Sequence, residues 1–349
     1  MKKILLINIL IFIFLYLILE VFSGNLIYKN KLSCGYLKCN FEKDYEINLY
    51  TDDKIKVKFK KNSLGFRGEE IFPDQIHTII MGGSTTAQRY LNEEDTWIKK
   101  LENKFNSKDM KIKFVNAGID GQSTFGHIWN LKNWIPKIKK IKPKYIIFYI
   151  GVNEYGDTRG FFDNNLNLSN NQNKTFSLFK KLKYLIIINR GITLDIINTY
   201  HKIFHQNKLK SIGHRKVNLD EIKYFYVSSD KLLNKNLKNL KANLNTIYKL
   251  TNKLNSTPIF ITQRTQRWKK IDNRIMNTNQ FEDYYNFEKI RSETIINFCK
   301  QNKIFCINTF QSVKDNVMIT YDLTHLNPKG SKYLSNLIFN KLYPVLKND

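Results

Sequence analysis

Hydrophobic residues are distributed unevenly along the chain, and the longest apolar run lies at the N-terminus. Ile4–Phe22 is almost entirely aliphatic or aromatic, is interrupted only by Asn8 and Glu20, and follows two lysines. At about 1.5 Å of rise per residue, a helix of this length nearly crosses the ~30 Å hydrocarbon core of a bilayer. A core helix would need a polar face, which this run lacks. We therefore expect an uncleaved membrane anchor; a cleaved signal peptide is the alternative, because Val21–Ser23 loosely resembles a cleavage site.

The remaining chain is expected outside the cytoplasm. Lysines lie on both sides of the apolar run, but large domains translocate largely regardless of charge. Cys34 and Cys39 are close enough, in a glycine-containing loop, to form a short disulfide in an oxidising compartment. Cys299 and Cys306 lie among apolar residues, where we expect buried free thiols.

A small β-hairpin is predicted soon after the anchor. Lys54–Lys60 alternates polar and apolar residues with period two, and Glu46–Tyr50 can pair with it across Asp52 and Asp53. The sequence Asn62–Gly68 (NSLGFRG) follows, and its glycines indicate a tight, structured turn ahead of the main domain.

Short apolar runs separated by helical patterns make up the rest of the chain. The five runs are Thr78–Met81, Lys113–Asn116, Tyr145–Ile150, Ile259–Thr262 and Phe305–Asn308. A last helix is expected to begin with Asn327 as N-cap and Pro328 at its first position. Buried strands that alternate with helices favour a parallel sheet covered on both faces. With right-handed crossovers, we expect a flavodoxin-like three-layer α/β/α sandwich with a five-stranded parallel sheet.

The chain thus divides into three parts. Residues 1–24 form the anchor or signal segment, 25–75 a linker with the small hairpin, and 76–349 the α/β domain. This domain carries a long insertion at about 155–234, which is far more than a crossover helix requires. A lid, a second membrane contact and a packed insertion remain open as its role.

Composition adds little about function. The 349 residues are 42% hydrophobic, enough for one large core and too many for a disordered chain. Lys and Arg total 57 against 30 Asp and Glu, a net charge of +27. Nucleic acid or anionic lipid would suit this charge. The excess is spread evenly among many Asn and Ile residues, however, as AT-rich codon usage would produce. Because no groove-reading motif is present, we expect no nucleic-acid partner.

Candidate chemistry follows the ends of the predicted strands, where open α/β sheets bind ligands. Ser84, Gly118 and Asn153 follow the first, second and third strands, and Asp322 and His325 follow the fifth. The His325 imidazole can take the proton of the Ser84 hydroxyl if Asp322 orients the ring. The Ser84 and Gly118 N–H groups and the Asn153 amide can bind an oxyanion. Ser84 is also expected at a helix start, where the dipole favours negative charge.

The order Ser, Gly, Asn, Asp-x-x-His resembles the SGNH (GDSL-type) hydrolase family, over roughly residues 75–345 apart from the insertion. The resemblance implies a serine esterase or deacylase without cofactor or metal. Its triad would be Ser84, His325 and Asp322, with Ser84, Gly118 and Asn153 as the oxyanion hole. Together with the anchor, Asn62–Gly68 is similar to a membrane-attached bacterial branch often seen with envelope carbohydrates. This implies O-acyl groups of an envelope carbohydrate or lipid as the substrate.

Two positions depart from the family pattern. Gly83 stands where the name-giving motif has Asp, and Glu154 where Asp is usual. Neither change removes a proposed catalytic group. The more familiar G-x-S-x-G nucleophile elbow is absent around Ser84.

Other residues capable of chemistry are expected to have ordinary roles. Gln88 and Arg89 could face the pocket, but we interpret them as solvated helix positions, and His214 as part of a solvated basic surface. His201 and His205 have the spacing of zinc ligands on a helix, but no third ligand accompanies them, so no metal is expected.

Two other functions remain compatible with the sequence. The same triad can pass the acyl group to a sugar hydroxyl instead of water, which would make the protein an O-acyltransferase. A catalytically inactive envelope-binding protein would keep the sandwich without the chemistry. The oligomeric state is left open.

Overall fold

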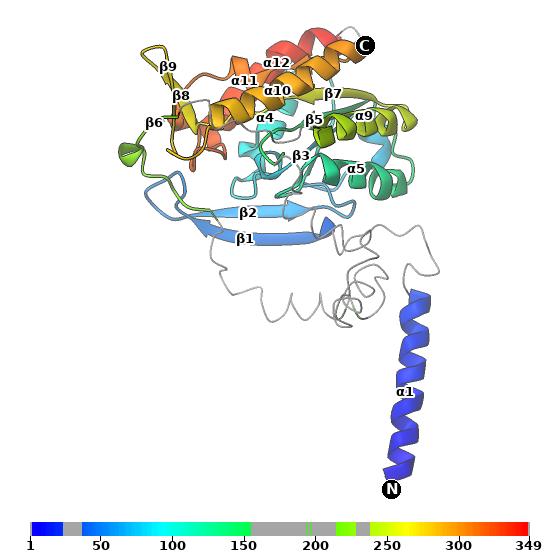
Figure 1. The fold of residues 1–349 in the computed structure, drawn as a ribbon. Coiled ribbons are helices and arrows are strands. Elements are labelled where there is room, and N and C mark those ends of the chain that lie inside the picture. Colours follow the sequence, from blue (N-terminus) through cyan, green and yellow to red (C-terminus); the bar gives the residue numbers. More distant parts are fainter. Residues whose placement is uncertain are drawn as a thin grey trace.

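The N-terminal helix projects away from the rest of the protein in this computed structural model, which describes residues 2–23, 37–154, 193, 196, 214–227 and 238–347. Helix α1 (Lys2–Ser23) contains the apolar segment Lys3–Phe22, which has a mean hydropathy of 2.8 and is nowhere buried inside the protein. By length and composition, this helix can serve as a membrane anchor or as a signal sequence (Figure 1).

A five-stranded parallel sheet forms the centre of the larger part of the chain. Its strands are β3 (Thr78–Gly82), β4 (Phe114–Gly118), β5 (Tyr145–Tyr149), β7 (Thr257–Ile261) and β10 (Cys306–Ile307). Their order is β10-β7-β5-β3-β4, and every neighbouring pair is parallel. All five predicted strands are confirmed. The chain reverses its direction across the sheet at β3, as in flavodoxin-like folds, and ligands bind at such a point.

Helices cover both faces of the sheet and complete the predicted three-layer sandwich (Figure 1). One face packs against α4 (Trp97–Asn106) and α12 (Pro328–Lys347). The other packs against α5 (Thr124–Asn133), α9 (Lys238–Lys253) and α10 (Tyr284–Asn302). Successive strand side chains point to opposite faces, so the neighbours Ile80 and Met81 belong to different cores. Shorter helices are α3 (Ser84–Ala87) and α11 (Thr309–Ser312), and 3₁₀ turns span Pro73–Gln75, Glu93–Asp95, Ile135–Lys137, Leu219–Glu221 and Val317–Ile319.

The last helix begins as predicted. Asn327 accepts the Gly330 N–H on its side-chain oxygen at 2.9 Å and the Ser331 N–H on its backbone oxygen at 2.9 Å, and Pro328 is the first helical residue. This cap fixes where α12 starts, directly after the segment that carries Asp322 and His325.

The hairpin is present, but its first strand lies earlier than predicted. Strand β1 (Phe41–Ile47) pairs with β2 (Ile55–Lys61), and Ile47 faces Ile55 across a longer connection than the expected Asp52–Asp53 turn. Apolar hairpin residues share a core with Tyr90 and Tyr321 of the α/β domain. The hairpin therefore packs against that domain.

The structure also contains a second antiparallel sheet, which was not predicted from the sequence. Strands β6 (Phe225–Tyr226), β8 (Trp268–Ile271) and β9 (Arg274–Asn277) form it in the order β6-β9-β8. The β8–β9 turn consists of Asp272 and Asn273, with φ of 46° and 63°. Asp and Asn tolerate this left-handed conformation, which tight hairpins require.

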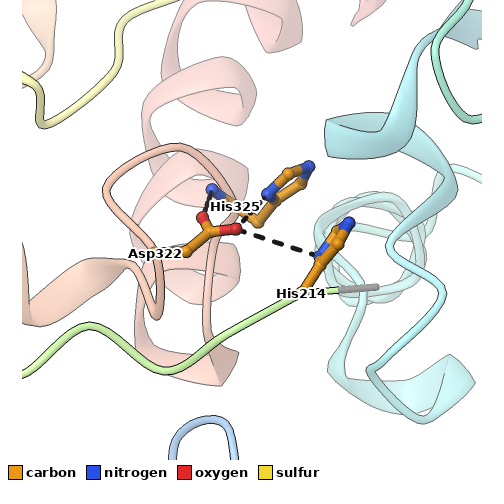
Figure 2. Close-up of side chains that lie close together, drawn as sticks. All are labelled: His214, Asp322 and His325. Atoms are coloured by element: carbon orange, nitrogen blue, oxygen red, sulfur yellow. Dashed lines mark hydrogen bonds and ion pairs between the residues drawn. The ribbon is translucent and has the colours of Figure 1, made fainter. Parts of the chain in front are cut away.

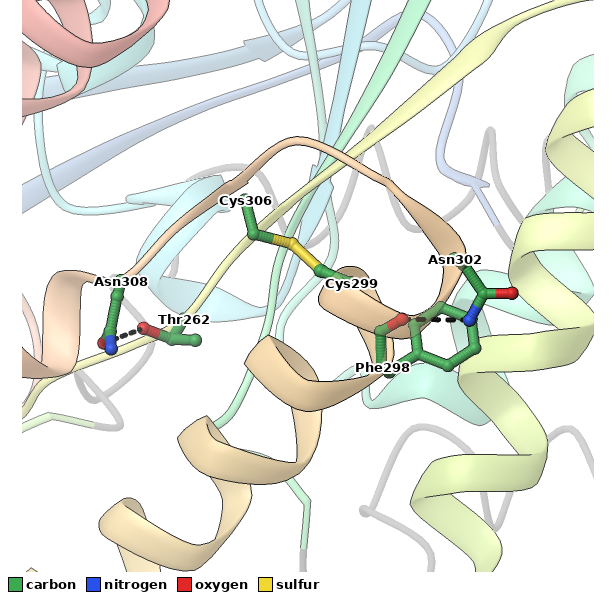
Figure 3. The surroundings of a disulfide bond; sticks show 6 residues. All are labelled: Thr262, Phe298, Cys299, Asn302, Cys306 and Asn308. Atoms are coloured by element: carbon green, nitrogen blue, oxygen red, sulfur yellow. Dashed lines mark hydrogen bonds between the residues drawn. A yellow bond between two sulfur atoms is a disulfide. The ribbon is translucent and has the colours of Figure 1, made fainter.

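The expectation of free thiols at Cys299 and Cys306 is wrong, because the two residues form a disulfide (Figure 3). Helix α10 ends at Asn302, and Lys303 takes a left-handed conformation with φ of 54°, so the chain turns back. The two cysteine Cα atoms are thereby 6.3 Å apart, within the usual range for a disulfide. Cys39 is also disulfide-bonded, but Cys34 lies outside the described residues.

Candidate active site

Ser84 lies directly beyond the carboxyl end of β3, where the chain turns sharply. The Thr86 and Ala87 N–H groups donate to Gly83 O at 3.1 and 2.9 Å, which closes a single helical turn. Helix α3 ends at once, because Gln88 is left-handed with φ of 44°. The expected helix dipole at Ser84 is therefore limited to one turn, and only individual N–H groups can stabilise negative charge there.

The loop between the 3₁₀ turn Val317–Ile319 and α12 holds Asp322 and His325 in a fixed relation. Asp322 Oδ1 accepts the Thr324 and His325 backbone N–H groups at 3.1 and 2.8 Å. Its other oxygen, Oδ2, lies 2.7 Å from His325 Nδ1 (Figure 2). Tyr321 N–H donates to His325 O at 3.0 Å and closes the loop. The carboxylate thus orients both the backbone and the ring of His325.

These loops bring the predicted catalytic side chains together. Ser84 Oγ lies 2.7 Å from His325 Nε2, although 241 positions separate the two residues in sequence. Burial by itself raises the pKa of the Asp322 carboxyl, but hydrogen bonds from His325 and the positive charge on its ring hold that pKa below its ordinary value. The order hydroxyl, imidazole, carboxylate is the one that general-base activation of a serine requires.

Asn153 lies beside the serine turn. Its side-chain Nδ2 donates to Gln122 O at 3.0 Å, which uses one of its two hydrogens. A Cβ built on Gly83 would lie only 2.2 Å from this nitrogen, so the absence of a side chain at 83 gives the Asn153 amide its place. Within the described part of the chain, the Ser84 backbone N–H has no partner. Both groups are therefore available as oxyanion donors.

The expectation that Gly118 supplies an oxyanion donor needs correction. Its N–H already donates to the Asn116 side-chain oxygen at 2.9 Å. A Cβ at 118 would come within 2.3 Å of Ala87 N, so this glycine allows β4 to approach the serine turn closely. Gly121, three positions further, has a φ of 71°, and its N–H has no partner among the described residues.

The departure at Glu154 has a structural purpose. The buried carboxylate accepts the Thr124 backbone N–H at 2.8 Å and the Thr124 hydroxyl at 2.9 Å. Glu154 thus caps the first turn of α5 and joins the loop after β5 to the loop after β4.

The motif Asn62–Gly68 does more than form a turn. Arg67 is 4% exposed, and its guanidinium donates to the backbone oxygens of Ala87, Gln88 and Leu91 and to the Glu93 carboxylate. These oxygens belong to the segment directly after Ser84. Sequence reasoning did not detect this role, because nothing in the motif indicates which carbonyl groups lie opposite it.

The interpretation of Gln88 and Arg89 as solvated helix positions is wrong. Gln88 is buried, accepts the Trp97 N–H at 2.8 Å and donates to Ser331 Oγ at 2.7 Å, so it joins the starts of α4 and α12. Arg89 pairs with Asp120 at 2.7 Å, at the edge of the site.

The loop after β7 was also not singled out from the sequence. Gln263 donates to Thr85 Oγ1 at 2.8 Å and accepts the Val152 N–H at 2.5 Å. Gln266 N–H donates to Leu323 O at 2.6 Å. This loop therefore links the serine turn, the Asn153 loop and the histidine loop. Its only sequence signal is a run of Gln, Arg and Thr directly after an apolar strand.

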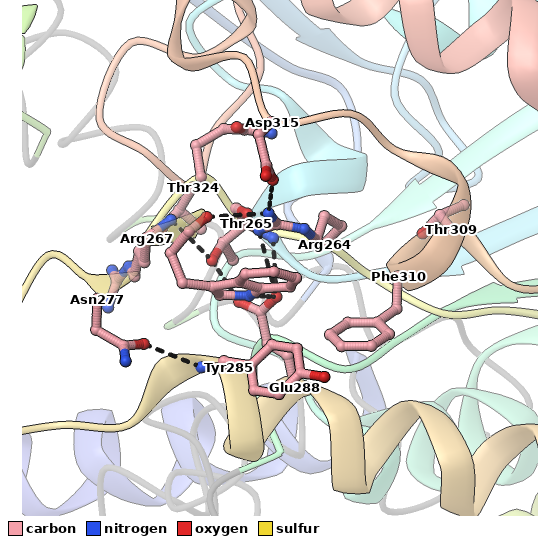
Figure 4. Close-up of polar contacts among 12 residues, drawn as sticks. Arg264, Thr265, Arg267, Asn277, Tyr285, Glu288, Thr309, Phe310, Asp315 and Thr324 are labelled. Atoms are coloured by element: carbon pink, nitrogen blue, oxygen red, sulfur yellow. Dashed lines mark hydrogen bonds and ion pairs between the residues drawn. The ribbon is translucent and has the colours of Figure 1, made fainter. Parts of the chain in front are cut away.

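A buried arginine anchors the same loop. The Arg264 guanidinium lies 3.3 Å from the centroid of the Trp268 ring and donates to Asp315 (Figure 4). Glu288, from α10, accepts the Thr265 hydroxyl and the Trp268 ring N–H. Both Nη atoms of Arg264 and the Glu288 carboxylate have local partners, and Arg264 Nε has none among the described residues. With most of its buried charged groups paired locally, the cluster has a structural role.

The expectation that His214 lies on a solvated surface is wrong. Its ring lies 4.2 Å from that of His325, centroid to centroid, and its Nδ1 is 2.8 Å from the Tyr321 hydroxyl. The insertion thus contributes a residue to the site.

His214, Asp322 and His325 place three ligand-type atoms within 4.8 Å of one another. Two nitrogen or oxygen ligands of one tetrahedral zinc ion are about 3.3 Å apart. Asp322 Oδ2 and His325 Nδ1 are only 2.7 Å apart, the distance of a shared proton. The geometry therefore favours a hydrogen-bonded pair. His201 and His205 lie outside the described residues.

Among known proteins, the similar ones are solved structures of low sequence identity. No family model and no curated protein matches the chain. Similar solved structures include an acetyl xylan esterase (13% identity, TM-score 0.43, covering 75% of this chain and 98% of that one). The psychrotrophic esterase EstA from Pseudoalteromonas sp. has 13% identity and a TM-score of 0.41, with 78% and 99% covered. A GDSL-like lipase from Bacteroides thetaiotaomicron has 11% identity and a TM-score of 0.41, with 80% and 92% covered. At such low similarity, the roles of side chains must come from this chain's own contacts.

Proposed function

We propose that this protein is a serine esterase or deacylase of SGNH (GDSL) type. The observation that carries the proposal is the continuous pair of contacts at 2.7 Å, from Ser84 Oγ to His325 Nε2 and from His325 Nδ1 to Asp322 Oδ2. Such a chain activates a hydroxyl that is otherwise a weak nucleophile at neutral pH.

The reaction would proceed through an acyl-enzyme. Ser84 Oγ attacks the ester carbonyl carbon while its proton passes to His325 Nε2. The carbonyl–oxygen ester bond then breaks, and His325 returns the proton to the departing alcohol oxygen. Water repeats the sequence, with His325 as base, and releases the acid and the free serine. Asp322 stays ionised and stabilises the imidazolium, consistent with the lowered pKa of its carboxyl.

The oxyanion would be held by the Ser84 N–H and the Asn153 amide. Gly121 N–H is the third donor in this proposal, in place of Gly118. Its loop is fixed to the serine turn by the Ile119 N–H, which donates to Gly82 O at 3.0 Å, and to Asn153 through Gln122 O. Loss of one such donor typically costs about 10²–10³ in kcat.

Covalent labelling with a fluorophosphonate probe tests the nucleophile directly. The wild type should be labelled, and Ser84→Ala should not. Ser107→Ala is the matched control, because its hydroxyl only bonds Lys104 O at the end of α4 and its loss should leave labelling unchanged. Labelling of the Ser84→Ala protein at the wild-type rate, or none of a folded wild type, would contradict the proposal.

We propose O-acyl groups of an envelope carbohydrate or lipid as the substrate and water as the acyl acceptor. The partly exposed ion pair Arg89–Asp120 supports a polar substrate at the site edge. Incubation with an acetylated polysaccharide should release free acetate. Acetyl transfer to an added polysaccharide acceptor, without free acetate, would instead identify an O-acyltransferase.

We further propose that α1 is an uncleaved anchor and that the α/β domain is extracytoplasmic. The exposed apolar segment Lys3–Phe22 and the Cys299–Cys306 disulfide support this, because disulfides persist mainly in oxidising compartments. The hairpin shares a core with Tyr321, so we assign it to the catalytic part rather than to a linker. N-terminal sequencing of the membrane-extracted protein should find the chain intact; a start near residue 24 would indicate a signal peptide.

A further inference from the structure

His214 lies against the proposed general base, although it comes from a different part of the chain. It opens the described stretch 214–227, within the insertion between β5 and β7. The His214 and His325 rings are 4.2 Å apart with an interplanar angle of 31°, and Figure 2 shows both beside the Asp322 carboxylate.

Contacts other than His325 hold His214 in place. Its Nδ1 shares a hydrogen bond of 2.8 Å with the Tyr321 hydroxyl, and Tyr90 meets its ring edge to face at 4.9 Å between centroids. Three residues further, Val217 N–H donates to Tyr321 O at 2.8 Å and fixes the backbone. The side chain is 23% exposed. The ring is therefore set in position independently of its neighbour.

Several charged or titratable groups act on this ring. Asp322 Oδ2, which lies 2.7 Å from His325 Nδ1, is 3.9 Å from His214 Nδ1. Burial lowers the pKa of His214, and the positive charge of a protonated His325 lowers it further; the Asp322 and Asp120 carboxylates act in the opposite direction, and Arg89 lowers it slightly. A neutral His214 ring can lie against the His325 ring without charge repulsion.

We propose that His214 is a positioning residue for His325. This inference rests on the proposed esterase function. The neutral ring covers one face of the His325 imidazole and limits its rotation, so that Nε2 stays on Ser84 and Nδ1 on Asp322. A proton on His214 would place a second cation beside the imidazolium that forms during the reaction, and the two would repel.

Substitution at 214 separates packing from charge. His214→Ala should lower kcat about tenfold, with KM nearly unchanged, because a misplaced base lowers the rate without affecting substrate binding. His214→Phe keeps a flat ring of similar size without a titrating group, so it should recover most of kcat. Tyr321→Phe removes only the hydroxyl and should lower kcat less than His214→Ala.

A spectroscopic measurement keeps the inference testable if a variant is poorly active. In the Ser84→Ala background, the proton shared by His325 Nδ1 and Asp322 should give a downfield NMR signal. His214→Ala should make this proton exchange faster with water, and His214→Phe should not. Circular dichroism and Tm establish that each variant is folded.

The outcomes distinguish this inference from the proposed function. Wild-type kcat in a folded His214→Ala protein would overturn the positioning role. A raised KM with unchanged kcat would overturn it too, since His214 would then contact substrate. If the folded wild type is not labelled by a fluorophosphonate, the esterase proposal itself fails, whatever His214 does.

Discussion

The groups proposed to react and the groups that hold them differ in location and environment. Ser84 begins the one-turn helix α3, and Asp322 and His325 lie in the loop before α12, where they are 19% and 17% exposed. Arg67 and Gln263 are buried, and both donate hydrogen bonds to the turn that carries Ser84. Proton transfer dictates the first set, whereas the second satisfies particular backbone and side-chain groups. Substitutions among the reacting residues should therefore lower kcat, whereas substitutions among the supporting residues should lower the free energy of unfolding.

Asp322→Asn should have the largest effect. An amide at this position favours the wrong tautomer of His325, and kcat should fall about 10⁴-fold. The fold should survive, because the amide oxygen can still accept the two backbone N–H groups. Steady-state kinetics and Tm check both parts. Asp53→Asn, in the exposed hairpin turn, is the control. An Asp322→Asn protein that unfolds, or that keeps the wild-type kcat, would contradict the distinction between reacting and supporting residues.

Arg67→Ala should act in the opposite manner. It leaves three backbone oxygens without their donor, and the free energy of unfolding should fall by about 3 kcal/mol. Urea unfolding measures this, with the exposed Arg274→Ala as control. At temperatures where the variant is folded, fluorophosphonate should still label it. A large loss of kcat without a loss of stability would instead mean that Arg67 takes part in the reaction.

The same division explains what the sequence could predict about the site. Ser84, Asn153, Asp322 and His325 are residue types that the chemistry requires, and they follow apolar strands, so they could be found by type and position. Contacts cannot be found in this way. The Gly118 N–H was expected to face the substrate, but the Asn116 side chain, only two positions earlier, occupies it. His214 lies 108 positions before its Asp322 neighbour within a basic segment, whose composition indicated only solvent.

The fold shows the same contrast between strong local signals and distant contacts. The five parallel strands were predictable, because strands buried on both faces are continuous apolar runs. Strands β8 and β9 contain Lys269, Lys270 and Arg274 and sit half exposed, so no apolar pattern marked them. The disulfide joins Cys299 and Cys306, which are only seven positions apart, but it depends on the turn after α10, and no apolar pattern marks that turn.

Gly83→Ala tests a supporting residue that touches a group proposed to take part in the reaction. Its φ of −86° is negative and accessible to alanine. The new methyl group, however, would meet the Asn153 amide, and kcat should fall about tenfold to a hundredfold through the displaced donor. A double-mutant cycle with Asn153→Ala checks the cause: in that background, Gly83→Ala should cost little more. Additive losses would show that Gly83 acts elsewhere.

The smallest expected effect is the contribution of Asp322 to stability, and its dependence on pH gives its sign. Hydrogen bonds from His325 and the charge on its ring hold the pKa of the folded carboxyl below its ordinary value, although burial alone would raise it. The unfolded chain then binds a proton more readily, so the contribution is complete above about pH 4 and is lost as pH falls through the folded pKa. Urea unfolding of the wild type and Asp322→Asn between pH 3 and 7 should show a stability difference that shrinks towards acid. A difference that stays constant, or grows as pH falls, would mean that the carboxylate is not stabilised by its contacts in the folded state and that Asp322 owes its place to the reaction alone.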